Sequence, residues 1–303
     1  MTERECKKAL RLIVRLVLLT VAIWWTLPSA IAQNWTVRKD VKYGATDQET
    51  GDFYILNTGV HPAVIFIHGG AWQAGDKSAY AGNYARIYAN AGFHVIAINY
   101  RLASNFDSTT QWNAPLQDTQ EAVRFIREAS GLLRIDPDRI AAAGDSAGAH
   151  LALFLGSLDT CAPNLGKGTD RCSLIASHSS KVNAVLDMFG PVDLIKLEAV
   201  DNLALFGGRP RKEVSDLYER SSPIFSINSA SAPTCIVQGL KDILVPPSQS
   251  YELQRALETN HVRYQFITYN GGHAFEGLTS SEQAEIDLRA LRCLSGILHP
   301  ESL

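Results

Sequence analysis

Ser146 lies in the Gly-x-Ser-x-Gly motif of residues 144–148, a spacing typical of a nucleophile held on a sharp turn. The apolar run 139–143 before it predicts a buried strand, and the Ala/Leu-rich stretch 149–155 after it predicts a helix. The two glycines make room for a turn at which side chains would collide, and such a turn exposes the serine above the sheet. His150 lies about one helical turn further on and is expected to point away from the turn. The spacing therefore predicts that Ser146 is a nucleophile.

A serine hydroxyl is a weak nucleophile, so it needs a general base and an acid that orients that base. His273 is the predicted base because it follows the last predicted strand on a glycine-rich loop. Asp242 is the predicted acid because it directly follows the apolar run 233–239. The order Ser146, Asp242, His273 is the chain order of α/β-hydrolase triads. Asp193 competes with Asp242 but is better interpreted as a turn or cap residue, since its strand is not the one just before the histidine loop.

Backbone amides from two segments are predicted to bind the oxyanion of an acyl-transfer reaction. The amide of Ala147 opens the helix after the nucleophile, where N–H groups lack intrahelical partners. The amides of Gly70 and Ala71 belong to a loop that follows the apolar run 63–67. Trp72, next in this loop, is interpreted either as a wall of the site or as a support of the loop, with support favoured.

The predicted elements around these motifs alternate between strands and helices. Buried strands are predicted at 63–67, 93–98, 182–189 and 233–239, and helices at 80–91, 116–129, 248–259 and 281–298. Residues 35–60 predict antiparallel edge strands, and 194–230 is a long excursion. This alternation indicates an α/β fold with a mostly parallel central sheet and helices on both faces. Ligands bind such sheets beyond the carboxyl ends of the strands, where every motif above lies.

Composition narrows the class of protein. The 303 residues carry a formal net charge of −3, with 46% hydrophobic and 19% charged residues, which is ordinary for a soluble globular protein and offers no basic excess for nucleic acid. The length fits one catalytic domain, residues 33–303, with a sizeable core. No Cys/His cluster has metal-ligand spacing, so the sequence predicts no metal site.

Residues 1–32 have the pattern of a secretory signal peptide. Basic residues precede the apolar block 16–27, and Pro28 and an Ala-x-Ala run follow it. Cleavage is expected before Gln33, which would leave a secreted or periplasmic protein with no membrane span. An uncleaved membrane anchor is the second interpretation, because the apolar block is short for a bilayer crossing.

Export changes how the cysteines are interpreted. Cys161 and Cys172 flank a polar loop with Gly and Pro, and an oxidising compartment permits a disulfide between them. Cys235 lies in a strand-like run and Cys293 in a helical one, so each is interpreted as a buried small hydrophobe.

The motifs together resemble those of the α/β-hydrolase esterases of the hormone-sensitive-lipase-like group, and most of all its bacterial acetyl and feruloyl esterases. The resemblance rests on His68-Gly69-Gly70-Ala71-Trp72, Asn99-Tyr100-Arg101-Leu102, Gly144-Asp145-Ser146-Ala147-Gly148, Ser222-Pro223-Ile224, the Asp242 and Val245-Pro246 segment, and Gly272-His273. It implies the α/β-hydrolase fold, a Ser-Asp-His triad, no cofactor, and a small ester or ester-decorated polysaccharide as substrate. The segment before Ala63 is too short for the large helical cap of some lipases in this group, which favours small acyl or aryl esters.

Four other functions remain open at this point. Arylformamidases share the His-Gly-Gly-x-Trp and Gly-x-Ser-x-Gly patterns, but they are mostly intracellular, and the signal pattern counts against them. A short-chain lipase would use the same triad. An exopeptidase of this fold usually carries a propeller domain, for which the chain has no room. A non-catalytic binding module would be expected to have lost a triad residue, and all three are present.

Overall fold

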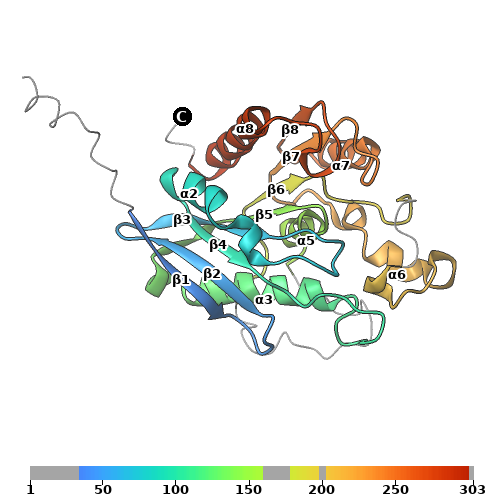
Figure 1. The fold of residues 1–303 in the computed structure, drawn as a ribbon, viewed down its shortest axis with the longest axis horizontal. Helices are drawn as coiled ribbons and strands as arrows, with labels where there is room; N and C mark the ends of the chain where they lie inside the picture. The colour runs from blue at the N-terminus through green and yellow to red at the C-terminus, as the bar shows by residue number, and fades with distance from the viewer. Residues whose placement is uncertain (1–33, 160–177, 198–202, 300–303) are drawn as a thin grey trace, which may run out of the picture. The chain divides into compact units, whose positions relative to one another are not determined.

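In the part of the chain that the structure describes, eight strands form one sheet in the order β1-β2-β4-β3-β5-β6-β7-β8 (Figure 1). The strands are β1 Trp35–Lys42, β2 Thr50–Leu56, β3 His61–Ile67, β4 His94–Ile98, β5 Ile135–Asp145, β6 Ala184–Met188, β7 Thr234–Gly239 and β8 Tyr264–Tyr269. Among these eight described strands, the pairs β1/β2 and β2/β4 are antiparallel, and the other neighbouring pairs are parallel. The predicted mostly parallel sheet with antiparallel strands at its N-terminal edge is confirmed.

The computed structural model describes residues 34–159, 178–197 and 203–299. Its strands and helices belong to one unit, Trp35–Leu303. The predicted signal segment 1–32 and the predicted Cys161–Cys172 pair lie outside the described residues and stay predictions. No helix within the described ranges is long and apolar enough to cross a membrane.

Helices cover both faces of the sheet (Figure 1). They are α2 Asn83–Asn90, α3 Ala114–Glu128, α4 Ser130–Leu133, α5 Ala147–Ser157, α6 Ser215–Arg220, α7 Pro247–Thr259 and α8 Ser280–Leu298. The apolar side chains of α2 and α8 share one buried cluster with one face of the sheet, and those of α3, α5 and α7 share another cluster with the opposite face. The fold class predicted from the alternation of strands and helices is therefore confirmed.

The helix expected over 80–91 is divided in two. A short 3-10 helix, η1 Lys77–Tyr80, precedes α2, and Gly82 stands between them with φ 69°. A left-handed backbone at Gly82 cannot continue an α-helix, which is the reason for the division.

The parallel strands place all the predicted site segments at one edge of the sheet. Parallel strands β3, β5, β6, β7 and β8 end side by side, so the loops that follow them meet there. Residues 140–144 of β5 are buried, and the run of three alanines there, 141–143, lets helices pack closely on both faces.

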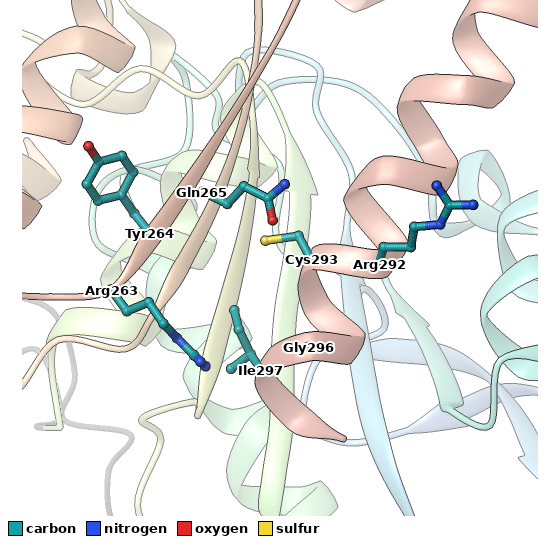
Figure 2. Close-up of a pocket in the computed structure, with 7 residues that line it drawn as sticks. All are labelled: Arg263, Tyr264, Gln265, Arg292, Cys293, Gly296 and Ile297. Atoms are coloured by element: carbon teal, nitrogen blue, oxygen red, sulfur yellow. The ribbon is translucent and has the colours of Figure 1, made fainter. Parts of the chain in front are cut away.

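Cys235 in β7 and Cys293 in α8 form a disulfide, with Cα atoms 6.1 Å apart. The prediction that each is an unpaired buried hydrophobe is wrong, although both side chains are buried. The two residues are 58 positions apart and meet only because α8 packs on the sheet. Figure 2 shows the Cys293 sulfur directed from α8 toward the strand that carries Gln265, beside a hollow of about 210 Å³.

The disulfide closes a loop of 58 residues that contains both Asp242 and His273. Replacing both cysteines by alanine should destabilise the fold by about 4 kcal/mol, because the unfolded chain regains the entropy of an open loop of this length. At about 2–4 °C per kcal/mol for a chain of this size, the melting temperature should fall by roughly 8–16 °C. Thermal unfolding with and without dithiothreitol measures this fall.

The Cys235→Ala/Cys293→Ala variant is also the control, because its melting temperature should change far less with dithiothreitol than that of the unaltered chain. Equal melting temperatures of the unaltered chain and the variant without reductant would show that the bond does not stabilise the fold.

Candidate active site

Ser146 stands on the sharp turn between β5 and α5, with φ 51° and ψ −118°. Its amide donates to the carbonyl of Met188 at 2.9 Å, which fixes the turn to the end of β6. A Cβ at Gly144 would lie 2.4 Å from the carbonyl carbon of Gly148, and a Cβ at Gly148 would lie 2.0 Å from the carbonyl oxygen of Ile67. Both motif glycines are therefore required by close backbone contact, as the sequence pattern indicated.

His273 connects Ser146 with Asp242. The His273 Nε2 atom is 3.1 Å from Ser146 Oγ, and its Nδ1 atom is 2.7 Å from Asp242 Oδ2. The other carboxylate oxygen of Asp242 accepts the amides of Leu244 at 2.9 Å and Val245 at 2.8 Å. These two bonds hold the carboxylate so that Oδ2 faces the imidazole. The structure thus brings the three predicted triad residues into one hydrogen-bonded chain.

The loops that carry Asp242 and His273 are bonded to each other. Lys241 donates its amide to the carbonyl of Gly271 at 2.9 Å. A Cβ at Gly239 would lie 2.6 Å from the same carbonyl oxygen, so the two loops are in direct backbone contact. The Phe189 ring, at the end of β6, packs edge-on against the imidazole with ring centroids 5.0 Å apart. The imidazole is therefore positioned from two sides.

Asp193, the competing acid, caps its own turn. Its Oδ1 atom accepts the amides of Ile195 at 2.9 Å and Lys196 at 3.3 Å, and its Oδ2 atom pairs with the Lys196 ammonium at 3.1 Å. A carboxylate with these partners has the structural function that the sequence interpretation gave it.

The predicted oxyanion loop, residues 68–75, follows β3 and turns back tightly on itself. The amides of Gln73 and Ala74 both donate to the carbonyl of Gly70 at 3.0 Å. Gly70, Ala71 and Trp72 all have left-handed backbone, with φ 109°, 52° and 61°. Gly70 and Ala71 are both exposed. The amide of Ala147 lies at the start of α5, directly after the nucleophile.

The buried side chains of His68 and Trp72 support this loop from inside the fold. The His68 ring stacks on Tyr100 with centroids 4.4 Å apart, and its Nδ1 atom donates to the carbonyl of Gly69 at 2.8 Å. Burial lowers the pKa of His68, which keeps the imidazole neutral. The Trp72 indole is only 2% exposed, so it lies under the loop rather than along a wall open to substrate.

Asp145 has a function that the sequence reasoning missed. It is the variable residue before the nucleophile, and its Oδ1 atom accepts the Gly69 amide at 2.9 Å and the hydroxyl of Tyr80. The carboxylate therefore ties the oxyanion loop to the nucleophile turn. The only sequence signal was the position of an acidic residue inside the Gly-x-Ser-x-Gly motif.

A cavity of about 170 Å³ is lined in part by Asp145 and Ala274, the sequence neighbours of Ser146 and His273, but by none of the three triad residues. Its walls come from η1, α2, α8 and the segments that flank the triad residues, and they are formed by Ala79, Tyr80, Tyr84, Asp145, Met188, Phe189, Ala274, Phe275 and Gln283. Aromatic rings dominate the lining, with the Asp145 carboxylate and the Gln283 amide as polar groups. Among the described residues, no group of three or more His, Cys, Asp or Glu side chains is arranged to hold a metal ion.

The BD-FAE family model matches residues 52–257 of this chain. Among curated proteins, esterase LipQ of Mycobacterium tuberculosis is 28% identical over 247 residues, which cover 78% of this chain and 56% of LipQ. Isoprenylcysteine alpha-carbonyl methylesterase ICME of Arabidopsis thaliana is 26% identical over 248 residues, with the same two coverages. The chain spans about half the length of the curated relatives it matches.

Solved structures show the same fold. A truncated form of a carbohydrate esterase from gut microbiota superimposes with a TM-score of 0.74 at 26% identity, over 87% of this chain and 98% of that chain. Thermophilic esterase Est2 of Thermogutta terrifontis has a TM-score of 0.69 at 21% identity, over 89% of this chain and 95% of that chain.

Proposed function

This chain belongs to the BD-FAE family, as its motifs predicted, and we propose on this basis that it is a serine carboxylic-ester hydrolase. The observation that carries the proposal is the hydrogen-bonded chain from Ser146 Oγ through the His273 imidazole to Asp242 Oδ2, at 3.1 and 2.7 Å. The 3.1 Å distance between Ser146 Oγ and His273 Nε2 is short enough for proton transfer from the hydroxyl to the imidazole. The esterase names of the relatives support the same class of reaction.

In the acylation step, Ser146 Oγ attacks the ester carbonyl carbon while His273 Nε2 takes the hydroxyl proton. The imidazolium that forms is stabilised by the Asp242 carboxylate at Nδ1. Negative charge develops on the former carbonyl oxygen, and the amides of Ala147, Gly70 and Ala71 donate to it. Collapse of the tetrahedral intermediate breaks the bond to the alcohol oxygen, which takes the proton from His273 Nε2 and leaves.

In the deacylation step, water takes the place of the alcohol. His273 Nε2 removes a proton from this water, whose oxygen attacks the acyl carbonyl carbon. Collapse of the second tetrahedral intermediate breaks the bond between the acyl carbon and Ser146 Oγ, and the His273 imidazolium returns its proton to Ser146 Oγ. The products are the free acid and the unchanged serine. No step calls on a redox group, in keeping with the absence of a cofactor implied by the family resemblance.

The proposed substrates are small acyl or aryl esters, such as acetyl or feruloyl groups on polysaccharide. The aromatic cavity of about 170 Å³, lined in part by the sequence neighbours of Ser146 and His273, supports this class, since it offers room for one small acyl chain or ring. A solved relative is named a carbohydrate esterase, which supports a sugar as the alcohol. A hydrolysis panel of acetyl, butyryl, octanoyl, feruloyl and formyl-aryl substrates tests the class. Highest turnover of octanoyl esters would instead indicate a lipase, and highest turnover of the formyl-aryl substrate an arylformamidase.

Export of the protein is proposed as well. The signal pattern of residues 1–32 and the Cys235–Cys293 disulfide support it, because disulfides persist in oxidising compartments. N-terminal sequencing of the protein recovered from its native host tests the expected cleavage before Gln33, and a chain that retains residues 1–32 would contradict it.

The size of the cavity makes a prediction about specificity. Ala79 is exposed at the cavity rim, so Ala79→Trp should place an indole in the space that an aryl group would occupy. We expect kcat/KM for feruloyl esters to fall by at least about 10-fold, and that for acetyl esters by less than about 3-fold. Ala81→Trp is the matched control, because Ala81 is exposed on the same segment but does not line the cavity. Equal losses for the two esters would show that the cavity does not hold the aryl group.

A further inference from the structure

The indole of Trp72 connects the oxyanion loop to a histidine inside the fold. Trp72 Nε1 lies 3.3 Å from Nδ1 of His150, in the first turns of α5. His150 Nε2 lies 2.6 Å from the carbonyl oxygen of Ser221, at the C-terminal end of α6. The His150 and Ser221 side chains are fully buried, so solvent cannot replace either partner. Three segments far apart in sequence are thus joined through one imidazole.

The partners of His150 define where its proton lies. A carbonyl oxygen only accepts hydrogen bonds, so Nε2 must carry the hydrogen that points to Ser221. Burial lowers the pKa of His150 to about 4, which leaves the ring neutral and Nδ1 free to accept. The indole N–H of Trp72 only donates, and it meets this acceptor. One neutral tautomer therefore satisfies both neighbours.

The loop above this contact needs an anchor. Ala71 and Trp72 are non-glycine residues with left-handed backbone, a conformation that persists only where surrounding structure enforces it. The backbone carbonyl of Trp72 also accepts the Ala103 amide, at 2.6 Å, so both ends of the residue are fixed. Around the imidazole, the Trp72 ring packs edge-on at 4.9 Å and the Phe154 ring at 5.3 Å. The left-handed turn that carries Gly70 and Ala71 is thus attached to an aromatic cluster.

We propose that Trp72 and His150, with the Ser221 carbonyl, are positioning residues that hold the oxyanion loop in its donating conformation. The inference rests on the proposed ester hydrolysis, since it assigns these residues to transition-state stabilisation in that reaction. His150 does not touch Ser146 or the substrate, and it acts only through the indole. The Trp72–His150 bond therefore contributes to kcat rather than to substrate binding.

The experiment compares Trp72→Phe, which removes the indole N–H, with His150→Leu, which removes both bonds of the imidazole. Each variant should lower kcat for p-nitrophenyl acetate by about 10- to 100-fold with KM changed by less than about 3-fold, because misplaced donors weaken the transition state. Affinity for a trifluoromethyl ketone, whose tetrahedral adduct places an oxyanion at the same donors, should fall by the same factor. The double variant should lose no more of kcat than the more impaired single variant, because both changes break the same Trp72–His150 hydrogen bond.

Phe154→Leu is the matched control, since Phe154 packs on the same imidazole without a hydrogen bond to it. It should lower the melting temperature but leave kcat and ketone affinity within about 3-fold. If Trp72→Phe and His150→Leu also keep kcat and ketone affinity while losing stability, the two residues are core packing only and the inference is wrong. The same kcat loss in Phe154→Leu would overturn it as well. Should His150→Leu fail to fold, Trp72→Phe alone decides between these results.

Hydrogen exchange separates this inference from the proposed function. Amides of residues 69–74 should exchange at least about 10-fold faster in Trp72→Phe than in the unaltered chain or Phe154→Leu, because the loop opens more often. This readout needs no substrate. Faster exchange in Trp72→Phe, together with an unaltered chain that hydrolyses no ester, would overturn the proposed function and leave the anchoring of the loop by Trp72 in place. Active enzyme with unchanged exchange and unchanged kcat in Trp72→Phe would overturn the anchoring and keep the function.

Discussion

Replacing Ser146 by alanine should lower kcat for p-nitrophenyl acetate by a factor on the order of 10⁶, the loss expected when a triad serine is removed. The hydroxyl is the atom that bonds the acyl group, and alanine offers no substitute. The 3.1 Å contact to His273 Nε2 shows that this hydroxyl has a base within reach. Only residual catalysis by the oxyanion donors and by binding should remain. Initial rates at saturating substrate measure the effect.

The same substitution should hardly affect the fold. The turn at Ser146 is fixed by two backbone hydrogen bonds, which the substitution leaves in place. The Ser146 amide donates to the Met188 carbonyl, and the Ser146 carbonyl accepts the His150 amide at 3.1 Å. A melting temperature close to that of the unaltered chain is the control. A Ser146→Ala variant that retains more than a trace of activity would exclude this serine as the nucleophile.

Asp242→Asn should lower kcat by about 10⁴-fold, because an amide cannot replace the carboxylate as an acceptor on both sides. Asp242 Oδ1 already accepts the Leu244 and Val245 amides, so the asparagine oxygen is held there and its NH₂ group faces His273 Nδ1. The imidazole must then carry its proton on Nε2. In that tautomer it cannot accept a proton from Ser146.

Asp193→Asn is the matched control for this prediction. Asp193 is a buried aspartate after the neighbouring strand β6, and its partners are Ile195 and Lys196 of its own turn. Its substitution should affect melting temperature more than kcat, with kcat within about 10-fold of the unaltered chain. A larger kcat loss in Asp193→Asn than in Asp242→Asn would move the acid to Asp193.

The sequence was sufficient to identify the segments that meet at the candidate site. Apolar runs that end in glycine or in a polar motif mark the carboxyl ends of buried strands, and parallel strands bring those ends together. Ser146, Asp242 and His273 follow three such runs, so their proximity could be predicted from order alone. The close backbone contacts at Gly144 and Gly148 followed from the same motif.

Contacts between side chains of distant segments could not be predicted in this way. The Cys235–Cys293 bond depends on how α8 packs on the sheet, and both sequences around the cysteines fit a buried hydrophobe equally well. The hydrogen bond from Trp72 to His150 depends on the left-handed turn of the oxyanion loop, which no local sequence pattern predicts. Such contacts follow from tertiary packing, whereas the motifs report only the local chain.

The most direct test of the serine hydrolase assignment is covalent labelling with a fluorophosphonate, followed by mass spectrometry of the intact protein and its peptides. The account predicts one adduct per chain, on the peptide that contains Ser146, with loss of ester hydrolysis in step with labelling. His273→Ala should label far more slowly, because the serine then lacks its base. Full ester hydrolysis by a chain that carries the adduct at Ser146, or an adduct on another residue that tracks the loss of activity, would contradict the account.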